Sequence, residues 1–508
     1  MYEVAIMFRE WWYSFKKDIP QMRKPFIILF CIYMIALSSL FRANYNYMDD
    51  LGRTAWGYLI WDAFSRYITQ FLAVFVHADT TLNDISPLPQ ILGVVVIVAS
   101  SLVLLKVYVK KYNLLSIIAV VPVGLSPFFL ECFSYKFDSP YMAVSVFVSM
   151  IPLLFIDCQT KLYHAVLAIG TIIMLLTYQA SSGIFMVCLV FLMALRWNRG
   201  IDGKECIRLI VTSGMVQLVV ALLFKFFLVK EYNSYVSTDV LTSQNFLSTI
   251  LGNITKYYKT IWSYSTLPWK VMTLGVIAAA VRTFLMDSKR DKIKASIVVI
   301  IIVLACSILS YGAYIALQKP LFSPRALYGF GVLIALLGII AVNGKTENIM
   351  GKIACIMLSW SMIVFSLAYG NALAEQKRFE TFRMQMVLHD VSKIPELNKD
   401  NIRKLQLKGS VGYSPVIQRM EYKYPILRAL VNIQMKSGFC FGEFYLFNYF
   451  SLPGVEQERN WGKKKYTIDD SSMPVFIDTA YHTIKYNDKS IVVLLKDEKI
   501  KYRTFYQE

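Results

Sequence analysis

Two adjacent carboxylates and a nearby arginine form the first group of residues in this chain that could do chemistry. The stretch 44–53 reads N-Y-N-Y-M-D-D-L-G-R and directly follows the first long apolar run. Asp49, Asp50 and Arg53 therefore stand where a chain leaves a membrane. Acidic groups at that depth are costly unless they face water, a partner or a substrate. They are candidates for catalysis, and the alternative is a polar loop with an ordinary Asp–Arg ion pair.

A second charged stretch, 126–140, reads S-P-F-F-L-E-C-F-S-Y-K-F-D-S-P. It carries Glu131, Lys136 and Asp138 among aromatic residues and between two prolines. We predict that this stretch lies beside 44–53 at the membrane surface. The alternative reading of its charges is a structural ion pair between Lys136 and Asp138.

Two further groups of polar residues follow later apolar runs. Tyr178, Gln179, Ser181 and Ser182 could hydrogen-bond a polyol, or they could simply cap helices. Arg325 stands at the start of a late apolar run, where its guanidinium could direct two parallel donors onto a phosphate. The alternative for Arg325 is anchoring at the membrane interface.

The composition is that of a polytopic membrane protein. Of the 508 residues, 56% are hydrophobic and only 17% are charged, and the mean hydropathy is +0.48, which no ordinary soluble protein shows. The net charge is +19, but apolar runs separate most of the basic residues from one another along the sequence. We interpret them as topology signals and expect no nucleic-acid partner.

Several common catalytic motifs are missing from the sequence. It contains no P-loop, G-x-S-x-G, H-E-x-x-H or Rossmann fingerprint, which disfavours a nucleotide-using cytoplasmic enzyme. A donor available at the outer membrane surface would instead be lipid-linked. The four histidines are scattered, and no C-x-x-C or zinc pattern occurs. Cys132 and Cys440 fall in predicted external segments, where unpaired thiols or a disulfide between them are both open.

The uncharged runs predict eleven membrane-spanning helices. A turn signal at 179–183 divides one overlong run into two spans. The predicted spans are 25–41, 85–105, 112–130, 139–156, two within 162–195, 207–229, 267–286, 295–318, 326–344 and 353–374. Lysine and arginine are concentrated in the segments that are cytoplasmic if the N-terminus is inside. We therefore predict a cytoplasmic N-terminus and an external C-terminus.

The fold class predicted is an all-α polytopic membrane protein with a small C-terminal α/β extramembrane domain. The membrane domain is expected to be residues 1–375, with an interfacial helix at 58–77 in the external loop 42–90. The alternative is that this helix packs on other protein. Residues 376–508 have no spanning run and are expected to form the external domain. Within it we predict strands at 439–450, 475–477 and 491–495, and helices near 382–390 and 424–435.

The stretches 44–53, 126–140 and 178–181 resemble the serotype-converting glucosyltransferases, the polytopic Gtr family of bacterial O-antigen modification clusters. The resemblance extends over most of the chain. It implies a GT-C-type enzyme of the bacterial inner membrane that takes glucose from undecaprenyl-phosphate-glucose on the periplasmic face. The acceptor is an O-antigen sugar, whose identity does not carry over because each member serves a different one.

The resemblance also implies a general base, and we assign the other polar residues from their chemistry. The general base is an acidic residue of the first external loop, and adjacent residues of an extended chain cannot both face one site. The candidate acids are Asp49 and Asp50, whereas Glu131 and Asp138 would orient sugar hydroxyls or serve as the alternative base. The proposed phosphate ligands are Arg53, Lys136 and Arg325, and Tyr178 and Gln179 are assigned to the sugar. A divalent metal ion could bridge an acid to the phosphate, but the sequence does not demand one.

Two rival functions remain. A transporter or flippase of a lipid-linked sugar predicts charges inside spans and broken helices. The other rival is a GT-C transferase for a different polyprenyl-phosphate-linked sugar. The predicted spans are nearly free of charge, which favours chemistry at the surface.

Overall fold

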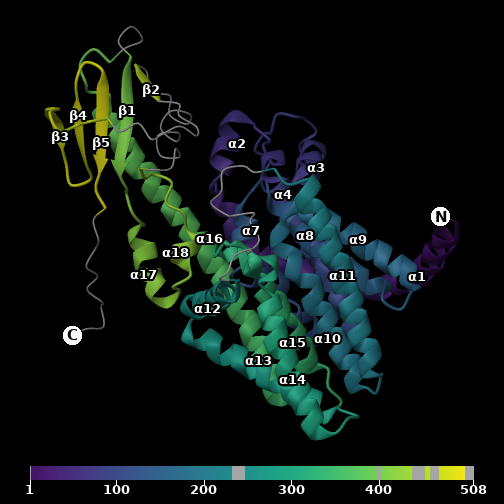
Figure 1. Cartoon of the computed structure of the whole chain (residues 1–508). Helices are drawn as coiled ribbons and strands as arrows, with labels where there is room; N and C mark the ends of the chain where they lie inside the picture. Colours follow the sequence, from purple (N-terminus) through teal and green to yellow (C-terminus); the bar gives the residue numbers. More distant parts are fainter. Residues whose placement is uncertain are drawn as a thin grey trace, which may run out of the picture. The chain divides into compact units, whose positions relative to one another are not determined.

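The computed structural model of this chain consists mostly of α-helices and ends in a small β-sheet (Figure 1). It describes residues 2–230, 246–397, 402–437, 452, 454–457 and 468–497. The predicted strand 439–450 and Cys440 lie outside these residues. Two compact units are present. The first is Met1–Ser39, Leu59–Thr80 and Ile85–Ala368, and the second is Leu40–Tyr58, Thr81–Asp84 and Tyr369–Glu508.

Eight helices in the described residues are long and apolar enough to cross a membrane. They are α1 (Tyr2–Ala43), α4 (Leu88–Tyr108), α9 (Thr160–Thr177), α10 (Ile184–Asn198), α11 (Gly203–Phe227), α13 (Leu267–Met286), α14 (Lys292–Leu309) and α16 (Ile349–Val391). In α1 the segment that could cross a membrane begins at Lys16. In α10 it also includes the preceding 3-10 turn η3 (Gln179–Gly183). Each coincides with a predicted span, and η3 lies at the predicted turn.

The other three predicted spans fall on shorter helices. They correspond to α5 (Leu114–Ala119) with α6 (Pro122–Leu125), to α8 (Ser139–Met150) with η2 (Ile151–Phe155), and to α15 (Gly329–Val342). Prolines begin or interrupt the first two of these segments. Every residue of α15 except Phe330 is buried, so packing within the protein already accounts for its apolar sequence. The count of eleven spans stays a prediction.

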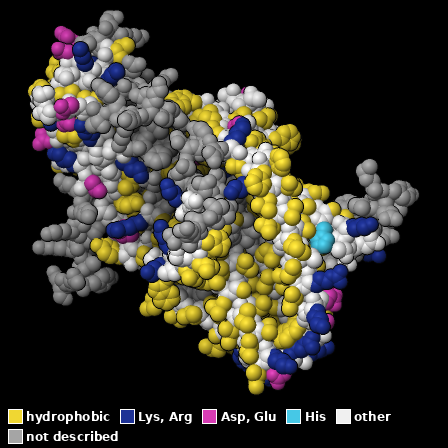
Figure 2. All heavy atoms as spheres, viewed as in Figure 1, with side chains coloured by type: hydrophobic (Ala, Val, Ile, Leu, Met, Phe, Trp, Pro, Cys, Tyr) yellow, Lys and Arg dark blue, Asp and Glu magenta, His cyan; other side chains and the backbone are white. Residues whose placement is uncertain are grey.

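Apolar side chains cover much of the outer face of the helical unit (Figure 2). In α11 only Cys206, Ser213 and Phe224 are buried, although the helix is long and apolar enough to cross a membrane. Its exposed residues include Ile207, Val211, Leu218, Leu222 and Phe226. Such exposure is typical of a helix that faces lipid. The protein is therefore a membrane protein.

The predicted interfacial helix at 58–77 is shorter than expected. The helix α3 (Tyr67–His77) is preceded by the short 3-10 turn η1 (Asp62–Phe64), because Ile60 and Ser65 have positive φ angles of 55° and 60° that no helix continues through. Phe71 and Phe75 of α3 are 72% and 78% exposed. Trp61, by contrast, is fully buried. The interfacial position of this helix stays a prediction.

The second unit contains a five-stranded sheet in the order β2-β1-β5-β4-β3. Its elements are β1 (Arg403–Gly409), α17 (Pro415–Lys423), α18 (Leu427–Leu430), β2 (Val455–Gln457), β3 (Val475–Asp478), β4 (His482–Tyr486) and β5 (Ser490–Leu495). The strand β1 runs parallel to both of its neighbours, and the remaining pairs are antiparallel. The strands predicted at 475–477 and 491–495 are confirmed. Of the helix predicted at 424–435, only the four residues of α18 are helical.

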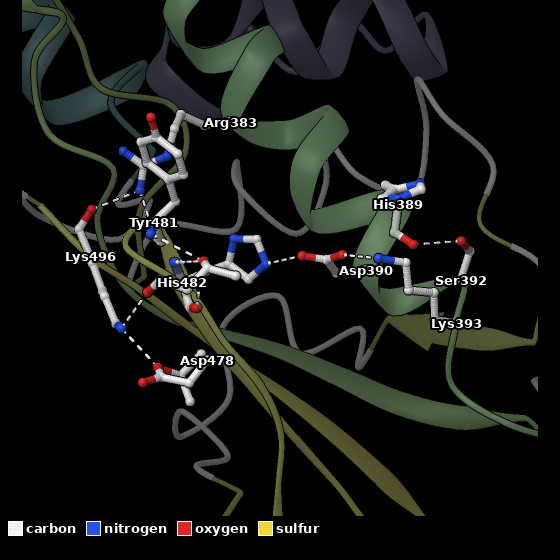
Figure 3. A network of polar contacts seen from close by, with 11 residues as sticks. Arg383, His389, Asp390, Ser392, Lys393, Asp478, Tyr481, His482 and Lys496 are labelled. Atoms are coloured by element: carbon white, nitrogen blue, oxygen red, sulfur yellow. Dashed lines mark hydrogen bonds and ion pairs between the residues drawn. The ribbon is translucent and has the colours of Figure 1, made fainter.

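The sheet packs on the C-terminal end of α16, which confirms the helix predicted at 382–390. Apolar residues of β1, β4 and β5 form one core with Met384, Val387 and Val391. Polar contacts fasten the same helix to β4 (Figure 3): the Nε2 atom of His482 lies 3.0 Å from Oδ2 of Asp390. Arg383 donates to the carbonyl oxygens of Tyr481 and Lys496 at 2.6 and 2.7 Å.

Three further helices complete the set within the described residues. They are α2 (Asp50–Trp56) in the second unit, and α7 (Leu130–Ser134) and the amphipathic α12 (Phe246–Tyr264) in the first. Short turns connect the later helices of the first unit, among them η4 (Gly312–Ala316) and η5 (Pro324–Ala326). The helix α16 runs without a break through the expected domain boundary at 375. The assignment of 1–375 to the membrane and 376–508 to the periplasm stays a prediction.

Candidate active site

A buried ion pair between Glu131 and Arg325 is the centre of the charged cluster in the first unit. Glu131 lies in α7 (Leu130–Ser134) and is 2% exposed. Its carboxylate accepts hydrogen bonds from the hydroxyl of Ser323 at 2.6 Å and from the backbone N–H of Arg325 at 2.8 Å. It also pairs with the guanidinium of Arg325. The predicted phosphate ligand Arg325 is therefore already neutralised within the protein.

The charged stretch 126–140 is buried within the protein at every residue. Its position beside 44–53 at the membrane surface stays a prediction. Asp138 precedes α8, and one of its carboxylate oxygens accepts a 2.6 Å hydrogen bond from the indole N–H of Trp61. Lys136 is equally buried. Charges removed from water must be compensated by neighbouring groups, and the aromatic residues of this stretch exclude water from around them.

The turn η3 and its neighbours form a network of hydroxyl groups. The hydroxyls of Ser181 and Tyr328 lie 2.7 Å apart, as do those of Ser181 and Ser145. Ser182 accepts a hydrogen bond from the N–H of Ala313. These serines thus bond to protein. Sugar binding by Ser181 and Ser182 stays a prediction.

Tyr178 and Gln179, the predicted sugar ligands, border this network. Tyr178 is 2% exposed and stacks on Tyr328 with ring centroids 6.4 Å apart. Its hydroxyl donates a long hydrogen bond to the Arg325 carbonyl oxygen. Gln179 donates to the carbonyl oxygen of Phe64 at 3.5 Å, and its side chain is only partly buried.

Arg66 is a charged neighbour that the sequence groups with Asp49, Asp50 and Arg53 in the external loop 42–90, but not among the predicted phosphate ligands. Its guanidinium carbon lies 4.7 Å from the centre of the Tyr178 ring. Burial raises the pKa of the Tyr178 phenol well above its ordinary value, and the positive charges of Arg325 and Arg66 partly offset this. Burial likewise raises the pKa of the Cys132 thiol, with Glu131 adding to the effect. Cys132 is a free thiol.

The adjacent aspartates of the second unit are placed differently from one another. Asp49 is the residue before α2 and is partly exposed. It occupies the N-cap position, but its side chain makes no capping hydrogen bond. Asp50 begins α2 and is fully buried, and its carboxylate accepts a 3.1 Å hydrogen bond from the N–H of Tyr47. The extended chain assumed from the sequence is replaced here by a helix, which sends the two side chains in different directions.

Arg53 lies one helical turn after Asp50 and is 3% exposed. Its guanidinium carbon is 5.9 Å from the centre of the Tyr58 ring. A Cβ atom at Gly52 would lie 2.8 Å from that ring, so the glycine permits Tyr58 to pack closely against the helix. Gly57 ends the helix with φ of 64°.

The segment that leads into Asp49 is held by a buried glutamate of α16. Glu380 accepts hydrogen bonds from the side chain of Gln376 at 3.1 Å and from the N–H of Gln434 at 2.7 Å. The hydroxyl of Tyr45 donates to Glu380 at 3.4 Å, and the side chain of Gln434 donates to the carbonyl oxygen of Asn46. These bonds connect the approach to α2 with the long helix.

No group of three or more histidine, cysteine, aspartate or glutamate side chains is arranged to hold a metal ion among the residues that the structure describes. A metal bridge between an acid and the phosphate stays a prediction.

Comparison with known proteins gives one family match and one relative. A family model described as glucosyl transferase GtrII matches residues 38–336, which is more than half of the chain. A protein of Salmonella phage P22, described as an uncharacterized 55.3 kDa protein in the gtrB 5' region, is 24% identical over 452 residues. The similarity covers 84% of this chain and 91% of the phage protein. No solved structure matches.

Proposed function

The chain belongs to the glucosyl transferase GtrII family, and on that premise we propose that it transfers glucose from undecaprenyl-phosphate-glucose to a sugar of the O-antigen repeat. The reaction takes place on the periplasmic face of the bacterial inner membrane in this proposal. The acceptor hydroxyl oxygen forms a bond to the anomeric carbon of glucose, and the bond from that carbon to the phosphate oxygen breaks. The hydroxyl proton passes to a protein carboxylate, and undecaprenyl phosphate leaves.

The proposal rests on the position of Asp49 in this chain, which belongs to the family. Its carboxylate is partly exposed and makes no hydrogen bond within the described part of the chain. A general base must be able to reach the proton that it takes. Asp50 is fully buried and bonded to Tyr47, so we assign the base to Asp49 and a positioning role to Asp50.

The departing phosphate gains negative charge and requires a nearby cation. The sequence nominates Arg53, Lys136 and Arg325 for this role. All three are largely buried, and Arg325 already pairs with Glu131. Tyr178 and Gln179 are retained as proposed sugar ligands.

The test compares the glycan of cells that express wild type, Asp49→Asn or Asp50→Asn, with the amount of each protein in the membrane measured alongside. Wild type adds a hexose, and Asp49→Asn lowers the rate by about 10²–10⁴-fold at normal abundance. Asp62→Asn is the matched control, because Asp62 is an exposed acid that pairs with Lys230. If only Asp50→Asn loses the added hexose, at normal abundance of the protein, Asp50 is the general base. An unchanged glycan in both variants would transfer it to Glu131 or Asp138.

Transport of a lipid-linked sugar is the second candidate function, and one observation favours it. The segment between α5 and α8 is a series of short helices that carries buried charges, and transporters use interrupted helices of this kind. If wild type adds no sugar but changes the distribution of the lipid-linked sugar across the membrane, transport replaces transfer. A transferase for a different polyprenyl-phosphate-linked sugar would instead add a residue other than glucose.

A further inference from the structure

Arg66, the residue before α3, is a cation whose side-chain donors have no hydrogen-bond partner among the residues that the structure describes. We infer that its guanidinium binds the phosphate of the lipid-linked donor, a role that the sequence gave to other residues. The inference rests on the proposed function, since a phosphate ligand is needed only if the donor is a polyprenyl phosphate.

Aromatic rings fix the position of the Arg66 guanidinium. Its central carbon lies 4.7 Å from the centre of the Tyr178 ring and 5.6 Å from that of Phe64. A guanidinium over the face of a ring is attracted by the ring quadrupole and keeps the edges of its plane available for hydrogen bonds. Tyr178 is itself held by stacking on Tyr328. The cation is therefore held in place before any ligand binds.

The donors of Arg66 have no acceptor in the described part of the chain. Its Nε atom is buried and makes no hydrogen bond. The two terminal nitrogens make none either and are not fully buried, and the side chain forms no ion pair. Burying a donor without a partner is costly. An anion that accepts from these nitrogens would remove that cost.

Other cations of the same unit show what Arg66 lacks. Arg325 pairs with the buried Glu131. Lys230 also lies over an aromatic ring, that of Tyr67, but it pairs with Asp62 at 3.1 Å. Recruiting Arg325 to a phosphate would take it from Glu131, whereas Arg66 can bind a phosphate without breaking an ion pair.

The chemistry of the leaving group fits an arginine at this position. The phosphate of the donor is a diester, and it becomes a monoester with additional negative charge when the bond to the sugar breaks. A guanidinium directs two parallel donors onto phosphate oxygens, and such charge-assisted bonds are short and strong. Because its charge and orientation are fixed in advance, Arg66 stabilises the departing phosphate more than the intact donor.

The test measures binding of lipids to the full-length protein in detergent, for wild type, Arg66→Gln, Arg66→Lys and Lys230→Gln. The probes are undecaprenyl phosphate, undecaprenol, which has the same chain and no phosphate, and dioleoyl phosphatidic acid. Arg66→Gln should raise the Kd for undecaprenyl phosphate by about 10- to 100-fold and leave that for undecaprenol unchanged. Arg66→Lys should fall between, because a lysine keeps the charge without the paired donors. Lys230→Gln should bind as wild type does.

Each other outcome has a defined meaning. If wild type transfers glucose and Arg66→Gln binds undecaprenyl phosphate as tightly as wild type, the inference fails and the proposed function stands. If phosphatidic acid binds as tightly as undecaprenyl phosphate and depends equally on Arg66, the residue binds phospholipid, and its role toward the donor is refuted. If wild type transfers no sugar, the proposed function fails and this inference with it. If Arg66→Gln also binds undecaprenol more weakly, that variant is misfolded. The affinity of Arg66→Lys for undecaprenyl phosphate, compared with that of wild type, then tests the inference.

Discussion

The ion pair between Glu131 and Arg325 gives the sharpest prediction, because the sequence and the structure assign Arg325 different roles. If the pair is structural, Arg325→Gln leaves the Glu131 carboxylate buried without its guanidinium. Breaking a buried ion pair by removing one partner costs about 3–5 kcal/mol. That is a large fraction of the roughly 5–15 kcal/mol that stabilises a typical protein. Arg325→Gln should therefore unfold at a clearly lower temperature than wild type.

Glu131→Gln should cost less than Arg325→Gln. The side chain of Arg325 is 13% exposed and that of Glu131 only 2%, so the guanidinium left behind can reach water more easily than the carboxylate can. The double variant Glu131→Gln/Arg325→Gln leaves no buried charge at either position. It should recover part of the loss, and the non-additivity measures the coupling within the pair.

The assay is thermal unfolding of the full-length protein in detergent, followed by tryptophan fluorescence. The pair formed by Lys230 and Asp62 is the matched control, because these side chains are 55% and 37% exposed. Breaking it with Lys230→Gln should cost less than about 1 kcal/mol. The reasoning is refuted if Arg325→Gln unfolds at the wild-type temperature and loses only its affinity for undecaprenyl phosphate. Arg325 would then be the phosphate ligand that the sequence suggested.

Two further predictions concern packing and pH. Gly183→Ala places a Cβ atom 2.0 Å from the carbonyl oxygen of Leu309, so it should lower the unfolding temperature through a loss of about 1–3 kcal/mol or more. Gly252→Ala, with nothing within 4 Å, should stabilise its helix by about 0.5–1 kcal/mol, and equal effects of the two would contradict the packing described. Burial holds the pKa of His482 below its ordinary 6.5, although Asp390 opposes this shift. The imidazole therefore binds a proton more readily in the unfolded chain than in the folded one. As a result, β4 should lose stability as the pH falls below about 6.5. Hydrogen exchange of β4 at pH 7.5 and 5.5, corrected for intrinsic rates, should show this loss in wild type and a smaller one in His482→Gln. The same loss in both proteins would rule out His482 as its cause.

The order of the helices could be predicted from the sequence with good accuracy. Uncharged runs of about twenty residues have few ways to satisfy their backbone groups other than as helices, in lipid or inside protein. What the runs do not specify is which of these surroundings they occupy. The helix α15 is as apolar as any span, yet it is short and enclosed by protein. Its neighbours, which decide this, come from distant parts of the chain.

The candidate residues could be predicted by type, but their partners could not. The sequence singled out Glu131 and Arg325 separately, and 194 residues separate them along the chain. Likewise the local sequence treated Asp49 and Asp50 as equivalent, until the start of a helix between them exposed one and buried the other. The local sequence indicates only which chemistry a side chain is capable of.

Arg66 shows the limit most clearly. In the sequence it is grouped with Asp49, Asp50 and Arg53 as a charged residue of the first external loop, without a role of its own. Its distinction comes from Tyr178, which lies over a hundred residues later and supplies the ring beneath its guanidinium. The sequence by itself determined a polytopic helical protein with acids and cations near the ends of its spans, because hydrophobic length and residue type are local properties. Only the tertiary structure decided which of these charges are paired within the described part of the chain and which are not, because the energy of a buried charge depends on the groups packed around it.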